Sequence, residues 1–368
     1  MGSDHDTRGL EQAILDRVRK RREMKAMKAL CFYEHGGPEV LRYDEVSDPV
    51  PGPDEVLVQV RSCALNHLDI WVRRGWPGLK LEMPHWGGSD IAGVIVGLGE
   101  GVTDWNEGQR VVADPGFNTV EDEFTRSGRH SMSPGYHILG EQVRGGLADY
   151  AVVPARNLLE IPDSLDFPVA AAPLLVTLTA WRMLIHRARL RTGETVLIVG
   201  AGGGVNSMAT QIAKLAGATV YVVASNEQKA AKAHELGADF VLDRSKVDWG
   251  REVSRLTGKR GVDVVVDNVG AATLGASMKA VARGGRIVIV GNTSGPLAEI
   301  DIRYIFSKQI SLIGSTMGDH QDFHEVTSLL WAGKLQPVID SVMPLSSGLE
   351  AMTMLEESDQ FGKIVLEP

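Results

Sequence analysis

The sequence predicts an α/β protein made of two units, an antiparallel β-rich unit followed by a doubly wound α/β unit. At 368 residues the chain is too long for one ordinary hydrophobic core and suits two domains. Short alternating runs broken by Pro and Gly occupy residues 27–155, which is typical of antiparallel strands. Near-continuous apolar runs alternate with helical segments over residues 156–315, which predicts a parallel sheet covered by helices on both faces.

Alternating apolar and polar residues mark the strands of the first unit. The clearest runs are EVLVQV at 55–60, RVVAD at 110–114 and YAVVP at 150–154. A stretch from 114 to 141 has no periodicity and is too long for a simple connection, so we expect it to be functional or the relic of a lost feature. Residues 1–26 are charged and permit a helix, and we expect them to form an N-terminal extension.

Buried strands rich in Val and Ile predict the second unit. They are TVLIVG at 195–200, TVYVVA at 219–224, VDVVVDNV at 262–269 and RIVIVG at 286–291. Helices are expected between them, at 205–216 and 226–237, and this alternation is typical of a doubly wound sheet. Residues 316–368 return to mixed structure and end in the strand-like FGKIVLEP, which we expect to pack back onto the first unit.

Composition and charge exclude several classes of protein. The net charge of −9 argues against a nucleic-acid-binding surface. The chain has two cysteines, Cys31 and Cys63, which can form neither a disulfide framework nor a four-cysteine zinc site. No apolar run reaches the length of a membrane span and no signal-peptide core is visible, so we expect a cytoplasmic protein that does not bind membranes.

A glycine-rich turn follows the first predicted strand of the second unit. The segment VLIVGAGGGVNSMATQIAKLAGA, residues 196–218, reads as a strand, a turn and a helix. Gly permits positive φ and close approach of the backbone to a pyrophosphate, whose charge then sits on the helix N-terminus. Counted as G-x-x-G-x-x-G from Gly200 and Gly203, the third glycine is replaced by Asn206, whose larger side chain must be accommodated at the helix–strand contact.

The next strand indicates which nicotinamide dinucleotide binds. NAD-binding domains normally place an acid at its end to accept from the ribose 2′-hydroxyl, whereas this strand ends in Ala224 and Ser225. A carboxylate would repel a 2′-phosphate, but Ser225, Lys229 and Arg244 can bind one. The sequence therefore predicts NADPH as cofactor.

Together these motifs resemble the medium-chain dehydrogenase/reductase superfamily of zinc alcohol dehydrogenases and quinone oxidoreductases. The resemblance runs from Met27 to Pro368, with GGPEVL, GSDIAGVIVGLGEGV, GGLADYAVV, LTAWRML and GVDVVVDNVG in the family's order. It implies a GroES-like domain at 27–155, completed by 316–368, and a Rossmann domain at 156–315. It also implies a small-molecule substrate bound in the cleft between them, and a homodimer or homotetramer.

The stretch SCALNHLDI raises the question of a catalytic metal. It contains three metal-binding residue types, at Cys63, His67 and Asp69. In zinc members of the resembled family, however, the position of Asn66 is a cysteine ligand, and their Gly-His-Glu motif corresponds to Gly88, Ser89 and Asp90 here. Since catalytic zinc takes three protein ligands, we expect no catalytic metal.

The long loop predicts the same loss for a structural metal. Zinc members with this loop length carry four cysteines, and the corresponding positions here are Thr119, Asp122, Thr125 and Ser133. None of these residues supplies a thiolate, so the resemblance implies a loop that has kept its length without its zinc ion.

The resemblance also assigns site residues. Asn66 and Asp69 match the N-x-x-D of the zinc-free quinone oxidoreductase branch, with the Asn66 amide donating to the nicotinamide ribose or the substrate oxygen. Thr179 is expected at a helix start near the nicotinamide, and Lys363 is expected to reach the cofactor phosphates. Cofactor contacts are further expected from His67, Gly200, Gly203, Gly204, Val205, Asn268, Gly291 and Asn292.

These observations favour a zinc-independent, NADPH-dependent reductase that adds hydride to an enone, a quinone or a related carbonyl compound. Without a Lewis acid, hydride addition to an acceptor that spreads its negative charge over an enolate or hydroquinone is less demanding. Oxidation of an alcohol or reduction of a simple ketone is more demanding. Two alternatives stay open: a zinc-free alcohol dehydrogenase or ketone reductase for bulky apolar carbonyls, and an NADPH-binding protein with little turnover.

Overall fold

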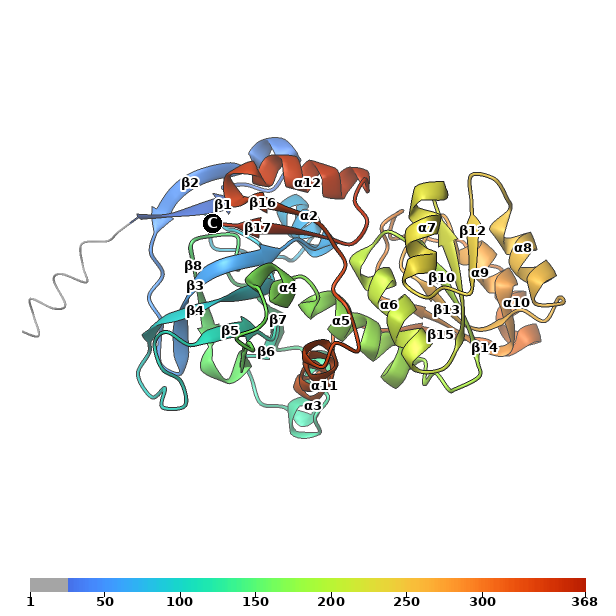
Figure 1. The fold of residues 1–368 in the computed structure, drawn as a ribbon, viewed down its shortest axis with the longest axis horizontal. Coiled ribbons are helices and arrows are strands. Elements are labelled where there is room, and N and C mark those ends of the chain that lie inside the picture. The colour runs from blue at the N-terminus through green and yellow to red at the C-terminus, as the bar shows by residue number, and fades with distance from the viewer. Residues whose placement is uncertain (1–25) are drawn as a thin grey trace, which may run out of the picture.

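The computed structural model describes residues 26–368, which form two lobes (Figure 1). The predicted extension 1–26 therefore lies outside the described residues except for Ala26, which begins strand β1. One lobe carries both the blue N-terminal strands and the red C-terminal strands, and the other carries the yellow and orange elements. The two lobes correspond to the two predicted units.

The second lobe is a six-stranded parallel sheet in the order β12-β11-β10-β13-β14-β15. Its strands are β10 (Thr195–Val199), β11 (Thr219–Ala224), β12 (Phe240–Asp243), β13 (Val262–Asp267), β14 (Val281–Ile289) and β15 (Ser311–Gly314). Its helices are α6 (Gly204–Leu215), α7 (Glu227–Glu235), α8 (Trp249–Leu256), α9 (Leu274–Ala280) and α10 (Ile302–Lys308). This is the strand order of a Rossmann fold, so the predicted doubly wound sheet is confirmed.

The first lobe is built on a largely antiparallel sheet in the order β16-β17-β3-β4-β5-β9, with β8 also paired to β3. Its strands are β3 (Glu55–Ala64), β4 (Asp90–Leu98), β5 (Arg110–Ala113), β8 (Tyr150–Pro154), β9 (Leu158–Glu160), β16 (Ile339–Pro344) and β17 (Lys363–Glu367). Two smaller pairs are β1 (Ala26–Cys31) with β2 (Arg42–Ser47) and β6 (Gly116–Asn118) with β7 (Tyr136–Ile138). β9 belongs to this sheet although it lies beyond the predicted domain boundary at 155.

The C-terminal segment joins the first lobe through strand pairing. In β17, Val365 lies opposite Ala64 and Leu366 lies opposite Cys63 of β3. Because β3 leads directly into α2 (His67–Arg74), this pairing brings the start of β17 next to the predicted catalytic segment. The fold thus places Lys363 beside Asn66, which is 297 residues away in sequence.

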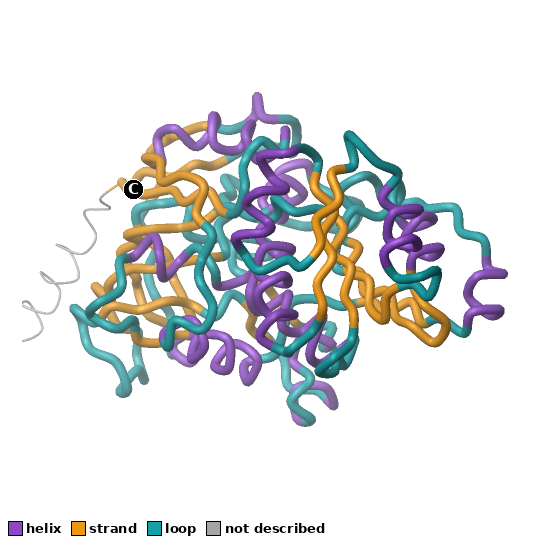
Figure 2. The backbone as a smooth tube through the Cα atoms, turned by 45° about the vertical axis from the view of Figure 1, so that its right-hand side comes forward, coloured by secondary structure: helices purple, strands orange, loops and turns teal. Residues whose placement is uncertain are grey.

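The remaining helices are short, and several connect or cover the sheets. They are α3 (Glu123–Arg126), α4 (Phe167–Ala171), α5 (Leu174–Trp181), α11 (His320–Trp331) and α12 (Gly348–Glu357), with a π-helical turn at Arg182–Arg187 after α5. Single 3₁₀ turns lie at Pro38–Val40, His130–Met132, Ala155–Asn157 and Leu345–Ser347. In Figure 2 the purple helices fill the middle of the molecule between the orange strands of the two lobes.

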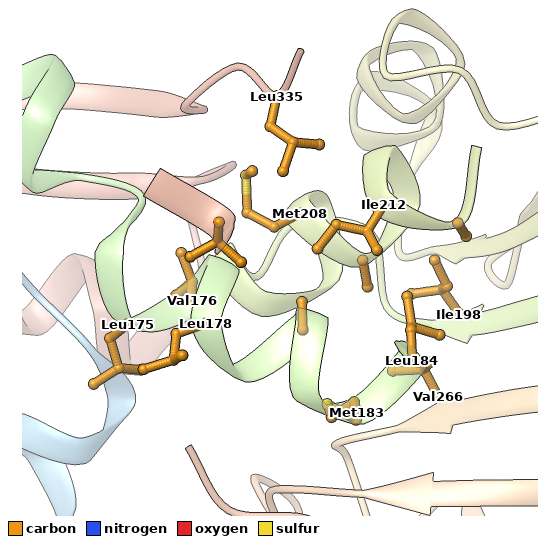
Figure 3. Close-up of a cluster of buried hydrophobic side chains, with 14 of the residues drawn as sticks. Leu175, Val176, Leu178, Met183, Leu184, Ile198, Met208, Ile212, Val266 and Leu335 are labelled. Atoms are coloured by element: carbon orange, nitrogen blue, oxygen red, sulfur yellow. The ribbon is translucent and has the colours of Figure 1, made fainter. Parts of the chain in front are cut away.

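A buried apolar cluster joins α5 to the Rossmann sheet. Val176 of α5 lies near Met208 of α6, and Leu175, Leu178 and Ile212 belong to the same cluster (Figure 3). The continuous helical stretch Phe167–Arg187 reaches the length and hydropathy of a membrane span, which corrects the expectation that no run is long enough. With 72% of its most apolar window buried inside the protein, its apolar side chains serve the core.

Candidate active site

A cleft of about 1040 Å³ lies between the two lobes and is lined by residues of both. Of the predicted site residues, the cleft brings together Asn66, His67, Thr179, Gly200, Gly203, Gly204, Val205, Ser225, Lys229, Arg244, Asn268, Gly291, Asn292 and Lys363. Asp69 is the exception and does not line it. Sequence reasoning missed other lining residues, among them Glu141, Trp249 and Met317.

The glycine turn between β10 and α6 forms one wall of the cleft. Gly200 has a φ of +103°, a conformation that side chains with a Cβ rarely adopt. Gly203 caps α6 without any side-chain hydrogen bond, and a Cβ placed there would meet no atom within 4 Å. The first N–H groups of α6 are therefore open to the cleft, and at the positive end of the helix dipole they suit a pyrophosphate.

The side chain of Asn206 is accommodated at the contact between β10 and α6 through hydrogen bonds. Its Nδ2 donates to the carbonyl oxygens of Val199 (3.0 Å) and Gly200 (2.9 Å), at the end of β10. Its Oδ1 accepts from Asn268 Nδ2 at 2.9 Å, and the backbone N–H of Val290 donates to Asn268 Oδ1 at 3.2 Å. The side chain thus links the turn to the ends of β13 and β14, where a third glycine would make no such contacts.

Two unneutralised cations lie at the far end of the cleft, beside the end of β11. The guanidinium of Arg244 and the ammonium of Lys229 form no ion pair with any carboxylate of residues 26–368. Lys229 Nζ donates to the backbone oxygen of Ser358 at 2.5 Å, and burial lowers its pKa. With Ser225 beside them, these groups offer a cationic, hydrogen-bonding pocket that suits a phosphate dianion.

A buried ionic network lies where α2 begins. Lys363 Nζ donates to Asn66 Oδ1 (2.6 Å) and to Asp90 Oδ2 (2.8 Å), and Asn66 Nδ2 donates to the same Asp90 oxygen at 2.9 Å. Lys363 is 4% exposed, Asn66 is 6% exposed and Asp90 is fully buried. The lysine and aspartate charges therefore compensate each other inside the protein, as buried charges must.

This geometry corrects two predicted roles. Lys363 was expected to reach the cofactor phosphates, but its ammonium is held by Asn66 and Asp90, and only its aliphatic stem approaches the turn, at Gly204. The Asn66 amide was expected to donate to the nicotinamide ribose or the substrate oxygen, but one of its N–H groups binds Asp90 and the other points to Ala64 O across 3.5 Å. The N–H groups of the Asn66 amide are thus largely engaged within the protein and are not free to donate to an oxyanion.

Asp69 is a positioning residue and not a catalytic one. Its Oδ2 accepts from the backbone N–H of Asn66 and its Oδ1 from that of Gly88, both at 2.7 Å. With Asn66 it forms a capping box at the N-terminus of α2. Burial raises the Asp69 pKa to about 6, and the two backbone donors oppose this rise. The prediction that Asp69 acts in catalysis does not match these contacts, because both of its carboxylate oxygens accept hydrogen bonds from backbone N–H groups.

His67 and Thr179 both lie in the cleft, but the prediction that Thr179 lies at a helix start is wrong. Burial lowers the His67 pKa, so the neutral imidazole packs edge-on against Trp71 with ring centroids 5.2 Å apart. Thr179 does not lie at a helix start, because α5 begins at Leu174 and places Thr179 in its second half. Its hydroxyl lies 3.9 Å from Met317 Sδ.

The wall of the cleft that faces the substrate is mainly apolar, and of Trp71, Trp86 and Tyr136 it contains Trp71. Trp71 lines the cleft, whereas Trp86 is buried and donates to Gly145 O at 3.0 Å, and the Tyr136 hydroxyl donates to Gly318 O at 3.2 Å. Other apolar residues that line the cleft include Leu68, Ile138, Leu175, Val290 and Met317. Apolar side chains thus dominate this wall.

Hydrogen bonds connect the loop positions that hold the structural zinc in zinc members of the resembled family. Asp122 Oδ1 accepts from the backbone N–H groups of Phe124 and Thr125, and Asp122 Oδ2 accepts from the Ser133 hydroxyl at 2.7 Å. The Thr119 hydroxyl donates to Gly135 O at 3.3 Å. The loop therefore closes through hydrogen bonds of its own polar side chains.

One group of side chains in the described part of the chain brings metal-binding atoms together. The ligand atoms of His186, Asp322 and Glu325 lie within 4.8 Å of one another. None of these residues lines the cleft, and Arg182 already pairs with Asp322 at 3.2 Å. This group is therefore separate from the candidate active site.

Comparisons with known proteins agree with the fold and the cleft. A family model described as an alcohol dehydrogenase GroES-like domain matches residues 52–163, and one described as a zinc-binding dehydrogenase matches residues 204–332. The chain is 31% identical to the quinone oxidoreductase of Homo sapiens over 350 residues, which cover 93% of this chain and 98% of that protein.

Two solved structures are similar over nearly the whole chain. The crystal structure of an NAD-dependent alcohol dehydrogenase is 42% identical with a TM-score of 0.89, covering 93% of this chain and 100% of that one. The crotonyl-CoA carboxylase/reductase AntE in complex with NADP is 25% identical with a TM-score of 0.85, covering 93% and 95%.

Proposed function

The chain belongs to the medium-chain dehydrogenase/reductase superfamily and is an oxidoreductase that uses a nicotinamide cofactor, and from that premise we propose that it is a zinc-independent, NADPH-dependent reductase. We further propose that its acceptor is an enone, a quinone or a related carbonyl compound. The observation that carries this proposal is the Lys363 ammonium, which lies between Asn66 and Asp90 at the place of the family's catalytic zinc ligands.

Zinc independence is supported by the chemistry of the donor set. Zn²⁺ prefers thiolate and imidazole, and a catalytic site takes three protein ligands. The positions of two family ligands are Asn66 and Ser89 here, and Asp90 is already neutralised by an ammonium 2.8 Å away. A divalent cation there would have to displace Lys363 against charge repulsion.

The residues present fit NADPH. The open N-terminus of α6 suits the pyrophosphate, and the cationic pocket of Ser225, Lys229 and Arg244 suits the 2′-phosphate. When bound, the cofactor supplies the hydride. The chain's own contribution is to hold it in the cleft, to exclude water with the apolar wall and to orient α2 through the Asp69 cap.

The apolar wall supports an acceptor whose negative charge is delocalised. Without a metal to stabilise an alkoxide, reduction of a conjugated C=C or a quinone is the less demanding reaction. The 42% identity to an alcohol dehydrogenase supports a second candidate, a zinc-free reductase of bulky apolar ketones. An NADPH-binding protein with little turnover is the third.

Parallel assays separate these candidates. We expect NADPH oxidation with a quinone or an enone to exceed that with a cyclic ketone, to persist in chelator, and to occur in protein without stoichiometric zinc. Faster ketone reduction would favour the second candidate, and no oxidation with any acceptor would favour the third. One zinc ion per chain, with activity lost on its removal, would contradict zinc independence.

Cofactor preference has its own test. Removing Arg244 as Arg244→Ala should weaken NADPH binding at least tenfold and leave NADH binding nearly unchanged, because a charge-assisted phosphate contact contributes about 1.5–3 kcal/mol. Arg251→Ala, an exposed arginine on α8 outside the cleft, is the control. Equal dissociation constants of the wild type for NADPH and NADH would contradict the assignment.

We also propose that two copies of the chain pair through the free edge of the Rossmann sheet. β15 is the edge strand, and exposed apolar side chains gather near it, at Leu297, Ile302, Phe306 and Leu312. Unpaired strand edges and exposed apolar groups favour association. Light scattering of Leu312→Lys against the wild type tests this, and an unchanged mass would contradict it.

A further inference from the structure

One acidic residue, Glu141, lies in the apolar wall of the cleft. Glu141 follows β7 and lines the cleft together with Ile138, Leu175 and Met317. Its backbone N–H donates to Ile138 O at 3.0 Å, which anchors the residue directly behind the paired strands β6 and β7. The side chain is half-buried, so it is shielded from bulk water yet open to the cleft.

No cation neutralises this carboxyl group. Within residues 26–368, no lysine, arginine or histidine forms an ion pair with Glu141, in contrast to Asp90, which is bound to Lys363. The contact it does make is to an uncharged group, since Gln142 Nε2 donates to Glu141 Oε1 at 2.9 Å. A carboxyl group in such surroundings favours its neutral, protonated form.

The charged groups around Glu141 do not reverse this preference. Burial raises the Glu141 pKa, and the hydrogen bond from Gln142 opposes the rise. Tyr136, which interacts electrostatically with Glu141, has a pKa raised well above its ordinary value and stays neutral. Other charged or titratable groups on its segment are His137 and Arg144, the latter paired with Glu82, and across the cleft are His67, Arg74 and Lys363.

We propose that Glu141 is the proton donor of the reduction, an inference that rests on the proposed function. Once an enone has accepted hydride at its β-carbon, its electron pair resides on the enolate. The Glu141 O–H bond then breaks, and the enolate pair forms a new C–H bond to that proton at the α-carbon. The Glu141 carboxylate regains its proton from water. Reduction thus consumes one hydride and one solvent-derived proton, with Glu141 unchanged overall.

Other hydrogen-bond donors lining the cleft nearby are less suited to this step. The Asn66 amide and the Lys363 ammonium hold each other and Asp90. The Thr179 hydroxyl is directed at Met317 Sδ, and a hydroxyl or amide proton is far less acidic than that of a carboxylic acid. Glu141 combines a position in the wall with an acidic proton.

The protonation state can be read without turnover. Infrared difference spectra of cofactor-free wild type minus Glu141→Gln should show a protonated carboxyl band that persists at pH values where ordinary glutamates, with a pKa of about 4.3, are already ionised. Glu123→Gln is the matched control, because Glu123 is an exposed acid on the same loop. A Glu141 band that titrates with the ordinary glutamates would overturn the proposal.

The destination of the proton is tested with 2-methylcyclohex-2-enone in D₂O. Wild type should deuterate the α-carbon on one face, and its kcat should fall as pH rises through the Glu141 pKa. Glu141→Gln should lose the facial selectivity at the α-carbon and this pH dependence, with kcat lowered tenfold or more. With NADPH deuterated at the transferred position, in H₂O, it should retain facial selectivity at the β-carbon. Glu141→Asp, which keeps the acid one methylene shorter, should partly restore the α-selectivity.

The possible outcomes distinguish failure of the proton-donor proposal from failure of the proposed function. A Glu141→Gln variant with wild-type α-selectivity and pH profile overturns the donor while the proposed function stands. If the wild-type protein fails to oxidise NADPH with every acceptor tested, the proposed function is overturned, and the proton-donor role of Glu141 with it. The infrared titration then reports only the protonation of Glu141 in the cleft.

Discussion

Two regions of this protein correspond to the metal sites of zinc members of the family, and their polar side chains are satisfied in different ways. At the start of α2, a buried ammonium, Lys363, takes over the positive charge next to Asp90. In the 114–141 loop, Asp122 and Ser133 form a hydrogen bond with no cation in it. A fully buried carboxylate needs a counter-charge, whereas a carboxylate near water needs only its hydrogen bonds satisfied.

The largest effect is expected at the buried site. Lys363→Met keeps the length of the stem but removes the ammonium, which leaves the Asp90 charge buried without a partner. Breaking a buried pair in this way costs about 3–5 kcal/mol, so the unfolding free energy at neutral pH should fall by that amount. Urea unfolding followed by fluorescence measures it.

A second variant tests whether charge compensation is the cause. Lys363→Met combined with Asp90→Asn removes both charges and should recover a substantial part of the lost free energy, as expected for coupled residues. If the double variant is no more stable than Lys363→Met alone, the ammonium acts by packing and the comparison between the two regions loses its basis.

The two regions should also respond to pH with opposite sign. Asp69, beside the buried network, has a pKa raised to about 6 from 3.8, so its protonated form favours the fold. Its stabilising contribution is complete below pH 3.8 and is lost as pH rises to about 6, a change of about 3 kcal/mol. The Asp122 pKa is lowered by hydrogen bonds to Thr125, so its contribution is lost as pH falls below 3.8.

Unfolding free energies measured between pH 3 and 7 check this. The difference between wild type and Asp69→Asn should shrink steadily from pH 4 to pH 6, at a rate set by one proton. The difference between wild type and Asp122→Asn should instead grow above pH 3. Parallel curves for both variants would contradict the opposite signs.

Most of the fold was predictable from residue patterns. Val- and Ile-rich runs identified β10, β11, β13 and β14 because strands buried on both faces carry little else. The edge strands β12 and β15 were missed because both are four residues long and partly exposed, which leaves no continuous apolar run. The strand-like end of the chain predicted that β17 packs onto the first unit, but its pairing with β3 was not predicted, because the two strands are far apart in sequence.

The parts of the site that depend on backbone conformation were predictable from the sequence. The hydrogen-bond and ion-pair partners of its side chains were less predictable. The turn between β10 and α6 depends on glycine for its backbone conformation, so the turn was recognisable from the sequence. Lys363 was assigned to the phosphates from the resemblance, and its pairing with Asp90 was missed because the two residues are 273 positions apart in sequence. Glu141 was missed because a lone acid after a strand carries no signal until the fold surrounds it with apolar residues.

An intermediate effect is expected from Asn66→Ala. The variant removes one hydrogen bond from Lys363 and one from Asp90 but leaves these two ions bonded at 2.8 Å, so the stability loss should be about 1–2 kcal/mol. We expect kcat to fall about tenfold, because α2 and Trp71 lose their anchor to the network, while NADPH affinity changes little. Stopped-flow and equilibrium binding measure the two quantities, and wild-type kcat on every acceptor would make Asn66 a turn residue only.

The smallest effect is expected in the loop. Ser133→Ala removes the hydroxyl that donates to Asp122 Oδ2 at 2.7 Å and accepts from the Gly135 N–H at 3.0 Å, yet water can reach the neighbouring half-exposed groups and replace part of what is lost. We therefore expect a loss of about 1 kcal/mol, well below that of Lys363→Met. Ser127→Ala, an exposed serine of the same loop that bonds only to local backbone and Arg129, should change stability less still. If Ser133→Ala instead costs as much as Lys363→Met, the loop network contributes as much to stability as the buried ion pair. The contrast between a buried charge pair and a solvated hydrogen-bond network then no longer explains how the two regions differ.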